Sequence, residues 1–396
     1  MREALLSRKL HTLQACLVLH ALFAISSSAA APDIVWQTNV AVSSIAFSAS
    51  GSELATGGSD QFVRVWSLSN RTAIAEMLNS DDVTSVALAS DSTFVVAGCD
   101  DGTARIWSTT GTLSCGSSPN ADIVLSVATA RSVVAVARSK GIVQLTLTPC
   151  AGGGISLQGH ERDVFCVALS PDATKLASAS ADGTARIWRV SDGASLQTLS
   201  GHSYFAPEDK EDETVINPVY SVAFSPNGEL LATSGADGTA RIWRVLDGEA
   251  LHVLQGGGIP YRAYPGSLVK FSCDGKSLYT LAAGVITLWR VMDGRLLTTY
   301  DNTGANTLSV NPDGKTFAYG IGGTLVLARV PLWIEEIQHT GSQVVLRWQG
   351  GTGRYQLQQR ANLSAGQWEN VGNPTTATSV TNAVAGSVFY RLQSLP

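Results

Sequence analysis

The sequence predicts an all-β protein, a seven-bladed β-propeller followed by a small β-sandwich domain. The propeller is predicted by a short motif that recurs along the chain at a nearly constant spacing. Residues 181–188 read Ala-Asp-Gly-Thr-Ala-Arg-Ile-Trp, and residues 236–243 repeat all eight unchanged. A repeat with a fixed period decides the architecture of the whole chain, because each copy is one structural unit.

Seven units align on the Trp that ends each motif, or on the residue that stands in its place. These positions are Trp66, Trp107, Thr146, Trp188, Trp243, Trp289 and Ala328. A period of about 40 residues is typical of the four-stranded blades of a propeller. Within a unit, β-rich runs alternate with Asp-Gly and Pro-Asn-Gly turns, which is the pattern of an antiparallel meander.

The chain resembles the WD40-repeat β-propellers between residues 34 and 330. The resemblance rests on the Asp-Gly…Trp copies, on two Gly-His pairs that end at His160 and His202, and on the turns 170–172, 225–228 and 311–314. The sequence departs from the family at one position. The Asp that usually follows the Trp is replaced by Ser67, Ser108, Arg189, Arg244 and Arg290.

The resemblance implies a buried hydrogen-bonded tetrad in two units. Its members are His160, Ser178, Asp182 and Trp188 in one, and His202, Thr233, Asp237 and Trp243 in the next. The same residue types also suggest a Ser-His-Asp catalytic triad. Because the set occurs twice, and once more in partial form without a His, we expect it to be structural.

Strand counting gives the last unit only three strands before the chain leaves the propeller. We expect residues 34–40 to supply the missing outer strand and to close the ring, which the family resemblance also implies. The propeller is therefore expected to span residues 31–331. Residues 332–396 lack the blade pattern and resemble a short fibronectin-III-like sandwich, which would serve as a tether, an adhesion domain or a spacer.

Residues 1–30 read as a secretory signal peptide, with a basic start, an apolar run and small residues before Ala31. The run is too short for a transmembrane anchor. Five cysteines remain after cleavage, so at least one is free or paired between chains. Cys166 is expected to be a small buried hydrophobe. For Cys115 and Cys150, a disulfide and two free thiols both remain open.

Two long loops in adjacent units are the candidate partner-binding surface, because long loops in compact domains are commonly functional or else disordered. For the acidic loop, a solvated, mobile segment is the alternative. They lie on the face where ligands usually bind in the family that the chain resembles. The candidate residues are Tyr204, Phe205, Glu208, Asp209, Glu211, Asp212, Glu213, Tyr261, Arg262 and Tyr264. The arginines two residues before the Trp, such as Arg186 and Arg241, are expected to pack along their strands and pair locally.

The net charge is −5 and no basic cluster is present, which argues against a nucleic-acid partner. No metal-ligand cluster, phosphate-binding loop or nucleophile motif stands out, so we expect no cofactor and no enzyme activity. The sequence favours an exported scaffold, monomeric, that binds a protein or peptide. The alternatives are a propeller hydrolase or lyase with a site at the channel mouth, and a carbohydrate-binding adhesion protein that uses Tyr355 and Trp368.

Overall fold

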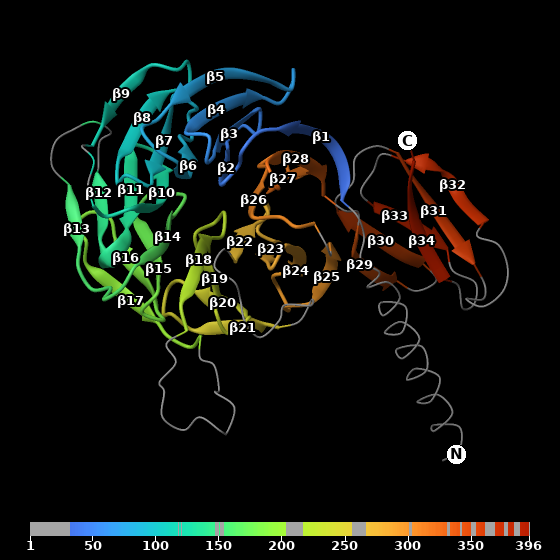
Figure 1. Cartoon of the computed structure of the whole chain (residues 1–396). Helices are drawn as coiled ribbons and strands as arrows, with labels where there is room; N and C mark the ends of the chain where they lie inside the picture. The colour runs from blue at the N-terminus through green and yellow to red at the C-terminus, as the bar shows by residue number, and fades with distance from the viewer. Residues whose placement is uncertain are drawn as a thin grey trace, which may run out of the picture.

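A computed structural model of the chain describes residues 32–117, 119, 121–146, 150, 154–202, 217–255, 267–300 and 303–330, and six strands between 333 and 395. The described elements are β-strands and one short 3₁₀ turn, η1 (Ser139–Gly141). Seven four-stranded antiparallel sheets stand around a common axis, and each is one blade (Figure 1). The prediction of an all-β, seven-bladed propeller is confirmed.

Blades one to six are each a meander of four consecutive strands, of which the first lies nearest the axis and the fourth lies outermost. Their bounds are β2 (Ser44–Phe47), β3 (Glu53–Gly57), β4 (Phe62–Ser67) and β5 (Thr72–Leu78); β6 (Val83–Leu88), β7 (Phe94–Cys99), β8 (Ala104–Ser108) and β9 (Leu113–Gly116); β10 (Val124–Ala130), β11 (Val133–Arg138), β12 (Val143–Thr146) and β13 (Ile155–Leu157); β14 (Val164–Leu169), β15 (Lys175–Ser180), β16 (Ala185–Arg189) and β17 (Ser195–Leu199); β18 (Val219–Phe224), β19 (Leu230–Gly235), β20 (Ala240–Arg244) and β21 (Ala250–Leu254); β22 (Leu268–Phe271), β23 (Ser277–Ala282), β24 (Val285–Arg290) and β25 (Leu296–Tyr300).

The seventh blade is built from both ends of the propeller. It consists of β26 (Thr307–Val310), β27 (Thr316–Ile321), β28 (Thr324–Arg329) and, as its outer strand, β1 (Asp33–Asn39). The guanidinium of Arg329 donates to Asp33 at 2.8 Å, next to the backbone ladder of β1 and β28. Strand counting predicts this pairing, which covers an edge that would otherwise be open.

The described core is divided into seven clusters of buried apolar side chains, and each cluster is shared by two neighbouring blades. The cluster of blades seven and one, for example, joins Leu325 and Leu327 to Leu54 and Trp66. The ring is therefore closed by packing as well as by strand pairing. Burial of apolar area against both neighbours is what stabilises a blade.

The recurring Trp has a fixed partner in the blade. In five blades it lies opposite an aliphatic residue of the second strand, in the pairs Leu54–Trp66, Val95–Trp107, Leu176–Trp188, Leu231–Trp243 and Leu278–Trp289. Blade seven reverses the sizes, with Phe317 opposite Ala328, both fully buried. Blade three has neither aromatic, with Val134 opposite Thr146.

Serine hydroxyls on the inner strands connect adjacent blades. The Oγ of Ser44, Ser85 and Ser126 each accepts the backbone N–H of a valine in the next inner strand, at 3.0, 3.0 and 3.2 Å. Cys166 holds the equivalent position in blade four and is only half-buried. The expectation that Cys166 is a small buried hydrophobe is thus met only in part: it packs against the core cluster of blades four and five, but it is half-buried, with Sγ 3.7 Å from the carbonyl of Val222.

Two three-stranded antiparallel sheets follow the propeller. One is ordered β29 (Trp333–Thr340), β30 (Gln343–Gln349), β33 (Ser379–Ala383), and the other β32 (Glu369–Thr375), β31 (Arg354–Arg360), β34 (Phe389–Leu395). The strand pairing alone does not show one sheet packed on the other. The fibronectin-III-like sandwich therefore remains a prediction.

Candidate functional site

The tetrad of blade four joins β15, β16, the turn between them and the segment before the blade. His160 Nδ1 lies 2.7 Å from Asp182 Oδ2, and His160 Nε2 lies 2.7 Å from Ser178 Oγ. The indole of Trp188 donates to the same hydroxyl at 2.8 Å. Gly159, at φ 154°, lets the chain pass close over the indole, since a Cβ there would lie 3.0 Å from the Trp188 ring.

Blade five repeats this geometry. His202 Nδ1 lies 2.9 Å from Asp237 Oδ1, and Nε2 lies 2.7 Å from Thr233 Oγ1, which accepts the indole N–H of Trp243 at 2.8 Å. The side chain of His202 is 2% exposed. The two tetrads thus hold equivalent places in adjacent blades.

The direction of the proton chain follows from the indole, which is only a donor. Because Trp188 donates to Ser178, the Ser178 hydroxyl donates to His160 Nε2, and Nδ1–H donates to Asp182. This is also the order of a Ser-His-Asp triad. Ser178, however, is fully buried and the His160 side chain is 1% exposed, so no substrate reaches the hydroxyl.

The two aspartates are held ionised within these networks. Burial opposes ionisation of Asp182, but hydrogen bonds from His160 and Thr184 outweigh it and lower the pKa of Asp182 below its usual range. The pKa of Asp237 is lowered for the same reasons, with burial opposed by His202 and Thr239. Both carboxylates are thus engaged by the histidine and a threonine of their own blade, which is a structural role.

Other blades retain parts of the network. Trp66 and Trp289 donate to Thr56 and Thr280, each at 2.9 Å, without a histidine. In blade two, the indole of Trp107 donates to Asn79 Oδ1 at 3.2 Å. The role of Asn79 was not predicted from the sequence, although its place just before an inner strand is the place of His160.

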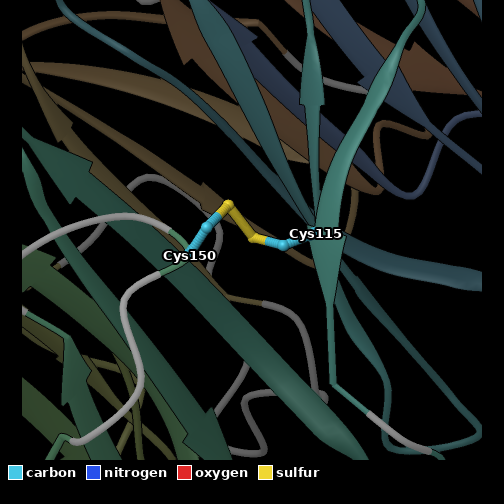
Figure 2. The surroundings of a disulfide bond; sticks show 2 residues. All are labelled: Cys115 and Cys150. Atoms are coloured by element: carbon cyan, nitrogen blue, oxygen red, sulfur yellow. A yellow bond between two sulfur atoms is a disulfide. The ribbon is translucent and has the colours of Figure 1, made fainter.

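A disulfide joins blades two and three. Cys115 on β9 and Cys150, between β12 and β13, are bonded with their Cα atoms 5.6 Å apart (Figure 2). The structure thus decides between the two alternatives left open by the sequence. Of the other described cysteines, Cys99 is buried, Cys166 half-buried and Cys273 exposed, and all three are free thiols.

Three of the arginines that stand two residues before a Trp make local contacts. Arg64 pairs with Asp60 at 2.6 Å and with Glu76 at 3.3 Å. The guanidinium of Arg186 lies over the Trp188 ring, 5.8 Å from its centroid, and Arg241 lies 3.6 Å from Asp237. These contacts agree with local packing and pairing of the arginines.

The candidate partner-binding residues lie outside the described residues. They are Tyr204, Phe205, Glu208, Asp209, Glu211, Asp212 and Glu213 of one loop, and Tyr261, Arg262 and Tyr264 of the other. What the structure describes is the base of each loop. His202 and Asn217 flank the first, Leu254 and Ser267 lie at or near the ends of the second, and all four are buried.

The described residues contain no group of three or more His, Cys, Asp or Glu side chains arranged to hold a metal ion. The same part of the chain has no helix with the length and apolar character needed to cross a bilayer. What the described residues define is a closed ring with two buried hydrogen-bonded tetrads.

These features define a class, the closed repeat propellers. Four segments, 35–67, 75–108, 154–189 and 212–244, match the WD domain, G-beta repeat. With its seven blades, the chain is a WD40-repeat seven-bladed β-propeller. WD40 propellers are typically non-catalytic and generally bind protein partners, in agreement with the expectation that the chain is no enzyme.

Three curated proteins illustrate the similarity. Apoptotic protease-activating factor 1 of Rattus norvegicus is 34% identical over 165 residues, 40% of this chain and 12% of that protein. Human F-box-like/WD repeat-containing protein TBL1X is 37% identical over 132 residues, 33% of this chain and 21% of that protein. Subunit I of eukaryotic translation initiation factor 3 from Candida albicans is 30% identical over 132 residues, 33% of this chain and 32% of that protein. The matched part of the chain spans less than a third of each of these relatives.

Proposed function

We propose that the protein is an exported, non-enzymatic scaffold whose propeller presents the loops of one face to a protein or peptide partner. The observation that carries the proposal is the closed ring with its two buried hydrogen-bonded tetrads. Because the blades are joined by strand pairing and shared core clusters, a partner would meet a preformed base, and less entropy would be lost on binding. The two long loops leave the ring from buried residues of adjacent blades, so their ends are fixed.

Export is supported by the disulfide between Cys115 and Cys150, since such bonds form and persist in oxidising compartments. The signal-like residues 1–30 support the same proposal. The C-terminal strands would form the fibronectin-III-like domain that spaces the propeller from its attachment point. Cell fractionation with mass spectrometry of the mature N-terminus tests export. Uncleaved protein in the reducing compartment would contradict it.

The binding face is tested by crosslinking and recovery of the partner from the native compartment. Two variants test the candidate loops separately: one deletes residues 203–216, and the other truncates three side chains of the second loop, Tyr261→Ala with Arg262→Ala and Tyr264→Ala. We expect each to reduce recovery of the same partner at least fivefold. The matched control changes exposed apolar residues at the other end of the strands, Leu246→Ser and Met292→Ser, which are 84% and 78% exposed. Equal loss in the control, or none in either loop variant, would refute the assignment.

A further inference from the structure

A cavity of about 290 Å³ lies where the inner strands of blades four to seven end, away from the tetrads. This volume is near the lower limit of small-molecule sites. Its apolar lining includes Leu169, Phe224, Phe271 and Val310, with Pro226 and Pro312 in the turns that follow. Three lining residues differ from these apolar side chains, namely Lys270, Ser272 and Cys273.

Lys270 breaks a pattern that the other six blades share. In each blade, one inner-strand residue pairs with the second-strand residue that lies opposite the Trp position. Lys270 comes directly before that inner-strand residue in blade six. The equivalent residues are Ala46, Ala87, Ala128, Ala168, Ala223 and Ser309. A lysine at one of seven equivalent small-residue positions is not required by the repeat.

The ammonium group of Lys270 has no hydrogen-bond or ion-pair partner among the described residues. The aspartates of the neighbouring turns are engaged elsewhere. Asp274 accepts from Ser272 Oγ at 2.6 Å and from a backbone N–H, and Asp313 accepts the backbone N–H of Lys315 at 2.7 Å. The cavity therefore has a largely apolar side-chain lining and one half-buried lysine whose ammonium group has no direct partner among the described residues.

We propose that this cavity binds a small organic anion with an apolar body, a carboxylate whose charged end pairs with Lys270 Nζ. The apolar part would lie against Phe224, Phe271 and Leu169, where it removes apolar surface from water. An ion pair at a half-buried lysine is less screened than one at the open surface, so the charge contributes to affinity. The site is separate from the loop face and does not depend on the partner proposed above.

The test uses 3-phenylpropionate as the probe, in equilibrium dialysis against the full chain. We expect one saturable site in the native protein. The uncharged analogue 3-phenylpropanol, with the same ring and chain, should bind at least tenfold more weakly. Lys270→Met should weaken 3-phenylpropionate at least tenfold, whereas Lys270→Arg should stay within about threefold of native. The matched control is Lys315→Met, an exposed lysine in the next turn that does not line the cavity.

Cys273 provides an independent readout, because it is a free, exposed thiol in the cavity lining. Its alkylation by iodoacetamide, followed by mass spectrometry, should slow at least threefold at saturating 3-phenylpropionate in the native protein and not in Lys270→Met. Thermal unfolding of Lys270→Met shows whether the variant is folded. Equal affinity of the native and Lys270→Met proteins, an unchanged Cys273 rate at saturation, or no saturable site would each overturn the proposal.

Discussion

Blades four and five each contain a complete hydrogen-bonded tetrad, whereas blades three and seven are stabilised by other interactions. In blade four, Trp188 packs on blade three and its N–H begins the hydrogen-bond chain to Asp182. In blade seven, Phe317 of the second strand occupies the blade interface and faces Ala328, where other blades carry Trp. The aromatic bulk has moved from one strand to its neighbour.

Blade three has lost both the Trp and its partner hydrogen bonds, and its interface with blade two is the smallest of the seven core clusters. The disulfide from Cys115 to Cys150 joins these same two blades. The buried Arg138 adds hydrogen bonds to the carbonyls of Gly102 and Asp122, which cross the interface and hold the turn. The comparison indicates that every blade interface of the propeller is stabilised, but that the interactions differ: hydrogen-bonded tetrads at some interfaces, and a disulfide with an arginine at another.

The largest expected effect is at the Trp of a complete tetrad. Trp188→Ala removes a fully buried indole and leaves Ser178 and His160 with an incomplete network, so we expect a loss of about 3–5 kcal/mol of unfolding free energy. Urea denaturation measures it. Trp107→Ala is the control, since Trp107 is less buried and its indole donates to Asn79 instead of to a hydroxyl linked to a histidine and an aspartate. A loss in Trp107→Ala equal to that in Trp188→Ala would show that the tetrad adds nothing.

Breaking the disulfide should come next. Cys115→Ser with Cys150→Ser releases a crosslink across 35 residues of sequence, and we expect a loss of about 2–4 kcal/mol. Denaturation is measured with and without a reducing agent. Reduction of the native protein should reproduce the loss, and the double variant should not respond to the reductant. A reductant effect that persists in the double variant would point to another cause.

A smaller effect is expected from the hydroxyl alone. Ser178→Ala leaves two buried groups unpaired, the indole N–H of Trp188 and His160 Nε2, at a cost of about 1–3 kcal/mol. Thr56→Val in blade one leaves only the indole N–H of Trp66 unpaired and should cost less. Thermal unfolding compares the two variants. Equal costs would mean that the histidine contributes little beyond packing.

The smallest net effect concerns the exchanged pair of blade seven. Ala328→Trp alone overpacks against Phe317, with an expected cost of about 1–3 kcal/mol. Adding Phe317→Leu recreates the Leu–Trp pair of other blades and should bring the total cost below about 1.5 kcal/mol, because total volume is nearly kept. The coupling is measured by a double-mutant cycle. Additive costs would show that the two positions do not share one space.

Much of this fold is predictable from the sequence, because the repeat places the third strand of every blade, including the degenerate copies at Thr146 and Ala328. Both tetrads were predictable through the family resemblance, since their residues recur at matched positions. The role of Asn79 was not predictable. Its amide accepts the indole N–H directly, in place of both a histidine and a hydroxyl, so the sequence shows no tetrad motif in this blade. The disulfide could not be predicted, because its formation depends on the distance between two blades, and the spacing of the cysteines along the chain does not give that distance.

The junction of β1 with β28 implies a particular order of events when the protein is made. Asp33 and Arg329 are bonded across 296 residues of sequence, so β1 finds its place only after the last blade has been synthesised. Contacts of such long range are slow to form, and we expect ring closure to be the rate-limiting event of folding. A circular permutant that attaches residues 32–40 after residue 330 would turn this distant contact into a local hairpin and should fold faster.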